Sequence, residues 1–361
     1  MVKYIGSKRV LAPLLADLAR RLEIASVCDL FAGTTRVGQA MRSAGLRVHS
    51  NDLATYSEML GLAYIAATED DRRRLPDLLD HLRGVEPIHG YFTETFCVQS
   101  RFFRPENGMK VDAMRNEIDR LDLSVIERGL LLTSLLEAAD RVDSTCGLQM
   151  AYVKKWAPRA FNPLELRTPA HVDGPPGEVS RVDANELAPQ LNELDCVYLD
   201  PPYNQHSYFS NYHVWETLVR WDAPEAYGVA CKRLDCKTTK SEYNSKPRSW
   251  PAFARLIESI PTPWLIVSFN NEGFHDPSNV EALLSEKGYV RLPGEGTVEV
   301  DQVKPRSALG DEPLSRRDRV AALHGHRLAA PLRQTDDSAL EHVDRGVDGE
   351  LVPHQQASML T

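Results

Sequence analysis

The sequence predicts an α/β protein in which a parallel sheet with helices on both faces is split by a mainly helical insertion. Near the N-terminus, short apolar runs alternate with helical patterns, which is the order that builds a parallel sheet. Such runs are missing from a charged, helical stretch between about residues 69 and 175, and they resume near residue 179. One interrupted domain explains both observations.

The elements before the insertion follow from apolar spacing. Apolar residues recur at helical spacing after Ser7, which is a candidate N-cap. Two short apolar strands follow, and each leads into a helix. The predicted elements are a helix at 9–23, a strand at 27–31, a helix at 36–44, a strand at 47–50 and a helix at 55–67.

The second half predicts more strands after a linker. Residues 117–142 predict one or two amphipathic helices, and the prolines and glycines of 158–177 predict a linker. The next expected strands are 179–183, 194–199 and 264–269. The chain therefore divides into an α/β domain of residues 1–60 and 179–300, a helical insertion of 61–178 and a C-terminal tail of 301–361.

The tail has an unusual composition. No Phe, Tyr or Trp follows Tyr289, although the chain holds 10 Phe, 12 Tyr and 5 Trp. A segment without aromatic residues buries little apolar surface. We expect residues 301–361 to be a degraded or disordered tail.

The composition excludes several classes of protein. No apolar run is long enough to span a membrane, and the first eight residues lack the apolar core of a signal peptide. We therefore expect a cytoplasmic protein. None of the six cysteines lies in a Cys-x-x-Cys pair or at zinc-ligand spacing from a histidine, so we expect structural thiols and no metal.

The net charge of −9 is unfavourable for nucleic-acid binding, but it does not describe how the charge is distributed. One basic face is enough for transient binding. Basic residues do cluster locally, at Arg101/Arg104/Lys110, at Lys154/Lys155/Arg159 and within residues 232–248.

The strongest chemical signal is Asp200-Pro201-Pro202-Tyr203, directly after a predicted strand. Open parallel sheets bind ligands at the carboxyl ends of their strands. Asp200 and the Pro201 carbonyl offer acceptors for the N–H groups of an aromatic amine, which frees the nitrogen lone pair, and the prolines stiffen the turn. Tyr203 offers a flat face for an extruded base. The alternative is a plain turn that closes a strand.

A glycine turn forms the second signal. Asp29-Leu30-Phe31-Ala32-Gly33 joins a predicted strand to a helix, so Gly33 lets the backbone approach a ligand near free helical N–H groups. It lacks the GxGxxG motif of nicotinamide enzymes, and such a turn often only connects a strand to a helix. Asp52 ends the next strand and suits two ribose hydroxyls, with helix capping as the alternative.

Two weaker signals complete the set. The N-terminal element Lys3-Tyr4-Ile5-Gly6-Ser7-Lys8 offers Tyr4 for stacking and Lys8 for a ligand carboxylate, or it is simply a basic strand with a helix cap. Asp183 ends the strand at 179–183 and suits an adenine amino group, with a helix cap as an equal alternative.

Together and in this order, the five elements resemble the Dam-like adenine-specific DNA methyltransferases. That family has a Lys-Trp/Tyr-x-Gly-x-Lys element, a Phe-x-Gly cofactor loop, a ribose-binding acid, a helical target-recognition insertion, an Asp near the adenine, and Asp-Pro-Pro-Tyr. The resemblance covers about residues 1–300, through Lys3–Lys8, Asp29–Gly38, Asp52, Asp183 and Asp200–Tyr203.

The resemblance implies a Rossmann-like class I methyltransferase sheet that uses S-adenosylmethionine and no metal. The implied cofactor contacts are Tyr4, Lys8, Phe31, Gly33, Asp52, Asp183 and Asp200, and the implied catalytic residues are Asp200, Pro201, Pro202 and Tyr203. The implied substrate is the N6 amine of an adenine flipped out of double-stranded DNA, which residues 61–178 read. Lysines of 233–244 would grip phosphates. We expect a monomer, with a cognate restriction endonuclease as a candidate partner.

The end of the chain departs from the family pattern. Relatives end with a strand hairpin rich in Tyr and Arg, which residues 300–319 resemble poorly, although 268–271 resemble the strand end before it. A catalytically impaired remnant that binds S-adenosylmethionine and DNA is therefore one alternative. Amino methylation of cytosine or RNA is another, but cytosine enzymes more often carry Ser at the Asp200 position and RNA enzymes often carry Phe at the Tyr203 position.

Overall fold

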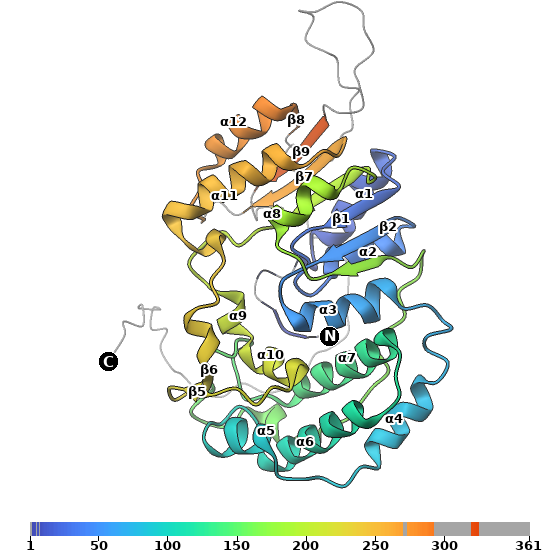
Figure 1. The fold of residues 1–361 in the computed structure, drawn as a ribbon, viewed down its shortest axis with the longest axis vertical. Coiled ribbons are helices and arrows are strands. Elements are labelled where there is room, and N and C mark those ends of the chain that lie inside the picture. Colours follow the sequence, from blue (N-terminus) through green and yellow to red (C-terminus); the bar gives the residue numbers. More distant parts are fainter. Residues whose placement is uncertain (1, 5, 7, 270–272, 292–318, 325–361) are drawn as a thin grey trace, which may run out of the picture.

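The computed structural model describes residues 2–4, 6, 8–269, 273–291 and 319–324 (Figure 1). Within them, a seven-stranded sheet has the order β3-β2-β1-β4-β7-β9-β8, with every neighbouring pair parallel. The strands are β1 (Ser26–Asp29), β2 (Arg47–Asn51), β3 (Glu178–Ser180), β4 (Cys196–Leu199), β7 (Trp264–Phe269), β8 (Tyr289–Arg291) and β9 (Arg319–His324). The predicted α/β fold is confirmed.

Helices cover both faces of this sheet. On one face, Val27 and Cys196 join a core with α1 (Ala12–Arg21) and α2 (Arg36–Ser43). On the other face, the residue that follows each of these two in its strand packs against a second set of helices. These are α8 (Ala184–Leu187), continued by η4 (Ala188–Gln190), α11 (Lys246–Ser259) and α12 (Pro277–Lys287). The alternation explains why these strands read as continuous apolar runs.

Between β2 and β3 the described chain forms helices and no strand, as the sequence predicts. The helical pattern is interrupted at 121–124, and Ser124 begins the next helix by forming a capping box with Glu127. Figure 1 shows these helices as a layer beside the sheet. They are α3 (Thr55–Gly61), η1 (Leu62–Ala66), α4 (Leu75–Arg83), α5 (Tyr91–Thr93), η2 (Glu94–Val98), α6 (Pro105–Arg120), α7 (Val125–Val142) and η3 (Pro158–Phe161).

The core of this helical layer extends beyond the insertion. Tyr56 from α3 (Thr55–Gly61) and Trp215 from α10 (His213–Arg220) are buried together with Phe92 and Leu135 of the insertion. After α10 the chain forms a small antiparallel hairpin before it reaches α11. That region contains β5 (Ala226–Tyr227), β6 (Lys232–Arg233), η5 (Leu234–Lys237) and η6 (Glu242–Asn244), while α9 (Tyr208–Asn211) precedes α10.

Some predicted elements need correction. The first helix begins at Ala12 rather than residue 9, and Leu11 occupies its N-cap position; Ser7 lies outside the described residues. The helix predicted at 55–67 is α-helical only to Gly61 and continues as the π-helix η1.

The tail also differs from its prediction where it can be described. Residues 319–324 form β9 inside the sheet, between β7 and β8 and parallel to both. The prediction counted only aromatic residues, whereas this strand is built on the aliphatic run Val-Ala-Ala-Leu. The rest of 301–361, and residues 270–271 of the 268–271 match, lie outside the described residues.

Two further findings concern the described chain. None of its helices combines the length and apolar character that crossing a membrane requires. All six cysteines are free thiols, and all but Cys146 are buried.

Candidate functional site

A cavity of about 370 Å³ lies where the carboxyl ends of β1, β2 and β4 meet. The chain continues from β1 to β2 on one side and from β4 to β7 on the other, and open α/β sheets bind ligands at such a switch point. Eight predicted residues line the cavity: Tyr4, Lys8, Phe31, Gly33, Asp52, Asp183, Asp200 and Pro202. Pro201 and Tyr203 instead line a separate apolar space of about 20 Å³.

The glycine turn needs Gly33 for two reasons. Its φ of +51° lies in the left-handed region, where a side chain is strained. A Cβ at this position would also lie 3.1 Å from the Tyr4 ring. That ring is held in place because it stacks on Tyr212, with centroids 4.6 Å apart, and on Tyr208, at 5.3 Å.

Asp52 fastens the end of β2 to this turn. One carboxylate oxygen accepts a hydrogen bond from the Gly33 N–H at 2.8 Å, and the other accepts from the Ala54 N–H at 2.9 Å. Burial raises the pKa of Asp52, while these two N–H donors oppose the rise. Asp52 therefore lies beside the glycine turn and holds the loop before α3, but it does not cap that helix, whose N-cap Ala54 has no side-chain cap.

Asp29 is a buried carboxyl group beneath the same turn. Its Oδ2 accepts from the Gly38 N–H at 3.2 Å, whereas Oδ1 is buried without a hydrogen-bond partner among the described residues. Burial, and then the nearby Asp200, raise its pKa to about 7. The sequence marks Asp29 only as the start of the glycine turn, although an acid at a strand's carboxyl end was the available signal.

Asp200 is the centre of a polar cluster at the end of β4. Lys8 Nζ lies 2.9 Å from Asp200 Oδ1, with the lysine side chain only 9% exposed. The Tyr203 hydroxyl lies within hydrogen-bonding distance of Asp200 Oδ1 and of the Ser268 carbonyl oxygen. Burial raises the pKa of Tyr203 well above its ordinary value, so this hydroxyl stays protonated and donates. Lys8 and Tyr203 thus fix the Asp200 side chain.

Asp183 combines the two alternatives considered for it. Its Oδ1 caps α8 by accepting from the Asn185 N–H at 2.8 Å, and its side chain also lines the cavity. Nearby in the lining, the Phe31 ring meets Tyr243 edge-on, with centroids 5.3 Å apart. Tyr243 in turn lies within hydrogen-bonding distance of Asn185 through its hydroxyl, at 3.2 Å. Two rings and a carboxylate therefore border this part of the cavity.

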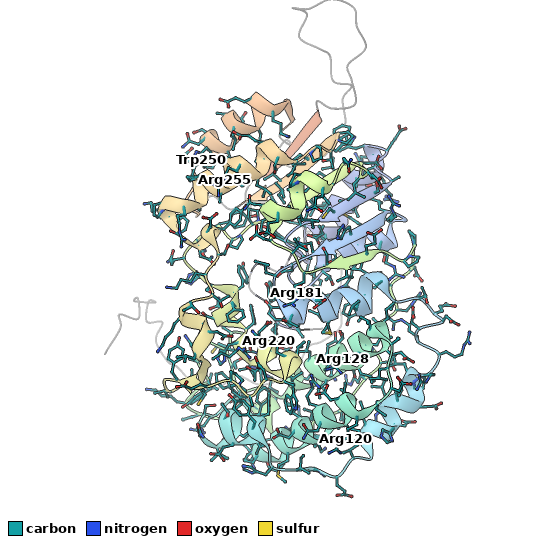
Figure 2. All side chains as sticks on the ribbon, in the orientation of Figure 1. Arg120, Arg128, Arg181, Arg220, Trp250 and Arg255 are labelled. Carbon is teal, nitrogen blue, oxygen red and sulfur yellow. The ribbon has the colours of Figure 1, made fainter. Side chains whose placement is uncertain are left out.

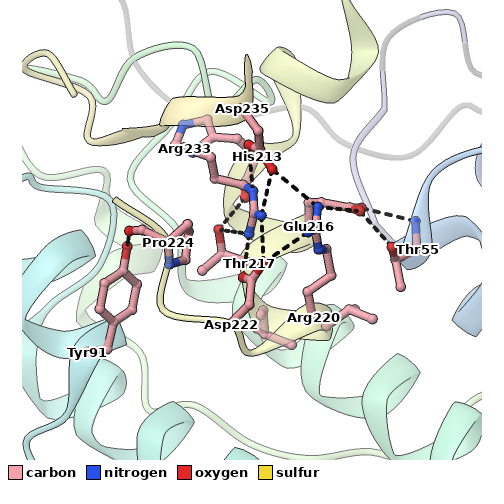
Figure 3. Close-up of polar contacts among 12 residues, drawn as sticks. Thr55, Tyr91, His213, Glu216, Thr217, Arg220, Asp222, Pro224, Arg233 and Asp235 are labelled. Carbon is pink, nitrogen blue, oxygen red and sulfur yellow. Dashed lines mark hydrogen bonds and ion pairs between the residues drawn. The ribbon is translucent and has the colours of Figure 1, made fainter. Parts of the chain in front are cut away.

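Several lining residues carry no sequence motif and were missed. Tyr56 and Tyr208 add to the aromatic wall around Tyr4. Glu216 lines the cavity from α10, and its carboxylate accepts from the Thr55 N–H at 3.0 Å and the Thr55 hydroxyl at 2.6 Å (Figure 3). These residues could not be predicted because they reach the cavity only through the packing of α3, α9 and α10.

The segment after β6 closes the cavity from a third side. Asn244 donates to the carbonyls of Asn204 and His206, at 2.8 and 3.0 Å, and so holds the loop after Tyr203. Figure 3 shows the anchor of this segment: the buried Arg233 guanidinium pairs with Asp222 at 2.7 Å and with Asp235 at 2.8 Å. The lysines expected to grip phosphates here, Lys237 and Lys240, are exposed.

Within the described residues, no cluster of three or more His, Cys, Asp or Glu side chains is arranged to hold a metal ion. The cavity lining combines carboxylates and aromatic rings with the basic side chains of Lys8, Arg36, Arg181 and Arg220. Such a lining offers charges of both signs beside flat apolar faces.

Comparison with known proteins gives a consistent result. Residues 4–264 match the family model for the D12 class N6 adenine-specific DNA methyltransferase. Type II methyltransferase M.NlaIII of Neisseria lactamica is 31% identical over 301 residues, which cover 80% of this chain and 89% of that protein. Modification methylase StsI of Streptococcus sanguinis is 30% identical over 79% of this chain and 46% of its own length.

A third relative, type II methyltransferase M.FokI of Planomicrobium okeanokoites, is 31% identical over 72% of this chain and 42% of its own length. The chain thus spans less than half of two of these relatives and most of the first. No solved structure matches it. The family model covers well over half of the chain, and the Asp200–Tyr203 motif lies inside the match. The chain therefore belongs to the D12 class of N6 adenine-specific DNA methyltransferases, and it is an adenine DNA methyltransferase.

Proposed function

We propose that this enzyme transfers the methyl group of S-adenosylmethionine to the N6 amine of an adenine flipped out of duplex DNA. The observation that carries the proposal is the Asp200 carboxylate, fixed by Lys8 at the end of β4, in one cavity with the glycine turn and Asp52. A methyl donor and an aromatic amine can both be held there.

The cavity fits the methyl donor of methyltransferases in general. When bound, S-adenosylmethionine supplies an electrophilic methyl group on a sulfonium. Asp52 suits its ribose hydroxyls, and Asp183 suits its adenine amino group beside the Phe31 and Tyr243 rings. The unpartnered, buried Oδ1 of Asp29 suits its ammonium group.

The target base would be held at Asp200. The Asp200 carboxylate and the Pro201 carbonyl accept hydrogen bonds from the adenine amine and orient its lone pair toward the methyl group, so positioning provides much of the rate. Stacking of Tyr203 on the base requires its ring to leave the space behind the turn, because its hydroxyl now contacts Ser268. Tyr208 already lines the cavity and offers a second flat face.

The partners follow from the substrate. The helical insertion of 61–178 would read duplex DNA, and the enzyme would act as a monomer in the cytoplasm, where DNA is available. The relatives' names, type II methyltransferase and modification methylase, place them in restriction–modification. A cognate restriction endonuclease is the corresponding partner for this chain.

The test is incubation with methyl-labelled S-adenosylmethionine and long, sequence-diverse duplex DNA. Label should appear on the adenine N6 amine, and Asp200→Ala should slow its appearance by roughly 10²–10³-fold, because the acceptor that orients the amine is lost. Asp195→Ala removes a carboxylate that accepts from Ser26 outside the cavity and is the matched control.

Other results would support the alternatives. Label on cytosine or on an RNA substrate would replace the adenine assignment. Binding of S-adenosylmethionine without label on any substrate would identify an impaired remnant instead.

A further inference from the structure

Basic and aromatic side chains gather on one part of the insertion, which we call the Trp156 surface. The Arg101 guanidinium lies 4.8 Å from the Trp156 ring centroid, and that of Arg104 lies 5.8 Å from it. Arg104 also lies 5.0 Å from the Phe161 ring, which is 62% exposed. With the exposed Lys154 and Lys155, these residues make up the surface.

The charge here differs from that of the helices around it. Residues 143–161 contain three basic side chains and one acidic one, Asp143, whereas 105–142 contain eight acidic and five basic. Asp143 is buried and already pairs with Arg159 and Lys3. Neither Lys154 nor Lys155 forms an ion pair with any described carboxylate, so both keep their charge for another molecule.

The segment that carries the Trp156 surface is hydrogen-bonded to two helices at the cavity. Gln149 lies in the same segment, and its N–H donates to the Asn211 carbonyl of α9 at 2.8 Å. Its side-chain oxygen accepts from the N–H groups of Val214 and Trp215 at the start of α10, at 3.1 and 3.2 Å. Because α9 also carries the cavity residue Tyr208, the segment that bears this surface packs against a helix that lines the cavity.

The contact between this segment and α10 does not depend on pH, because it includes the buried side chain of His213. Its Nε2 lies 2.9 Å from the Gln149 carbonyl oxygen, to which it donates, and the Phe102 ring separates it from Tyr152. Burial lowers the pKa of His213 to about 3, so it stays neutral at every pH at which the enzyme would be assayed.

We propose that the Trp156 surface binds the sugar–phosphate backbone of the substrate DNA beside the target adenine, with Lys154 and Lys155 facing phosphates. This rests on the proposed function. Unpaired cations beside stacked guanidinium groups suit a polyanion, because Lys and Arg contacts with phosphates release bound counterions. The partner is therefore duplex DNA, and within the insertion this surface is the part that holds the backbone.

The experiment measures how salt weakens binding to a fluorescein-labelled DNA duplex, by anisotropy. Each lost phosphate contact reduces the slope of log K against log salt by about one, so Lys154→Ala/Lys155→Ala should make the slope less steep by about two. The KM for DNA in methyl transfer should rise several-fold.

The matched control is Arg73→Ala/Arg120→Ala. It removes two charges from the same insertion, at side chains that are 78% and 76% exposed. Arg120 ends α6, roughly 24 Å along that helix from Arg104 at the rise of an α-helix; Figure 2 labels it at the lower edge of the helical layer. This control should change the slope by much less than one.

An unchanged slope in the lysine variant, or equal changes in both double variants, would overturn the proposal and favour another partner for the surface. Thermal unfolding of both variants checks that these exposed substitutions leave the fold intact. The result is separable from the proposed function. If the wild-type enzyme methylates DNA while the lysine variant keeps the full slope, only the surface assignment fails; if the wild type transfers no methyl group, the proposed function fails.

Discussion

At the scale of single residues, the site depends on placing two carboxyl groups close together under a glycine turn. Asp200 has Lys8 as its counter-charge, whereas among the residues that the structure describes Asp29 accepts a hydrogen bond from the Gly38 N–H and has no partner for its other oxygen. A buried carboxylate with so little support is costly, which is why its pKa rises to about 7. Such a group stabilises the fold when neutral and binds a cation when ionised.

This arrangement predicts a specific pH dependence of stability. Because the pKa of Asp29 rises from 3.8 in the unfolded chain to about 7 in the folded one, the folded state holds the proton more tightly. The resulting stabilisation is complete below pH 3.8 and is lost as pH rises through 7. It amounts to at most about 4 kcal/mol, since each unit corresponds to about 1.36 kcal/mol.

Asp29→Asn should remove this contribution, because an amide does not titrate and can still accept from Gly38. Urea unfolding of both proteins between pH 5 and 8.5 measures it, and the difference between them isolates Asp29 from other buried acids such as Glu216. The free energy of unfolding should fall less with pH in the variant. Parallel pH profiles would show that Asp29 ionises normally.

The sequence predicts residues whose role follows from their position in a motif. Gly33, Asp52 and Asp200 lie at strand ends beside turns, and the fold brings them into one cavity as expected. Glu216 and Tyr208 could not be found in this way, because they reach the cavity through the packing of α10 and α9. The position of Tyr203 behind the turn depends on Ser268, which is 65 residues away in sequence.

At the scale of elements, two glycine turns allow a direct comparison. Gly33 and Gly228 both have left-handed backbone, with φ of +51° and +70°. A Cβ on Gly33 would press on the Tyr4 ring, whereas a Cβ on Gly228, in the loop between β5 and β6, would meet no atom within 4 Å.

Substitution by alanine should therefore separate two effects. Both positions share the strain of a left-handed backbone, but only Gly33 lies against the Tyr4 ring. Gly33→Ala and Gly228→Ala should each cost about 1 kcal/mol of stability through strain. Only Gly33→Ala should also weaken S-adenosylmethionine binding, by about tenfold or more, because about 1.4 kcal/mol of disturbance at the turn is enough for that change. Calorimetric titration of both variants measures the affinity, and equal losses would mean that the turn does not contact the donor.

Elements were predictable where periodicity alone determines them. The strand at 264–269 has the predicted bounds, since its apolar run is buried on both faces. The π-helices η1 and η2 were not predictable, because an extra residue per turn leaves no signature in apolar spacing. Helix α10 was also missed, although its sequence separates His213, Glu216 and Thr217 from the apolar residues at helical spacing; seven of its eight residues are buried all the same, which a polar face does not indicate.

At the scale of the whole molecule, the insertion is continuous in sequence but not in its core. Tyr56, Tyr212, Trp215 and Leu218 all come from outside residues 61–178, and all are at most 2% exposed within the core of the helical layer. The buried Arg115 of α6 donates to the carbonyls of Leu218 and Val219 at the end of α10, both at 2.9 Å. The layer is completed only when the sheet domain contributes α3 and α10.

A polypeptide of residues 61–178 alone should therefore not fold cooperatively. Burial of each large apolar side chain is worth about 1.5–3 kcal/mol, so losing four partners removes roughly 6–12 kcal/mol, about the entire stability of a typical domain. Arg115 would also be left without its two carbonyl acceptors, at a further cost. Near-ultraviolet circular dichroism and urea titration of the excised piece should show no fixed aromatic packing and no sigmoidal transition, whereas the full chain shows both. A cooperative transition in the excised piece would establish the insertion as an independent folding unit, which could then change in sequence separately from the methyl-transfer site. Without such a transition, any change in the helical layer must also preserve its contacts with α3 and α10, which line the cavity.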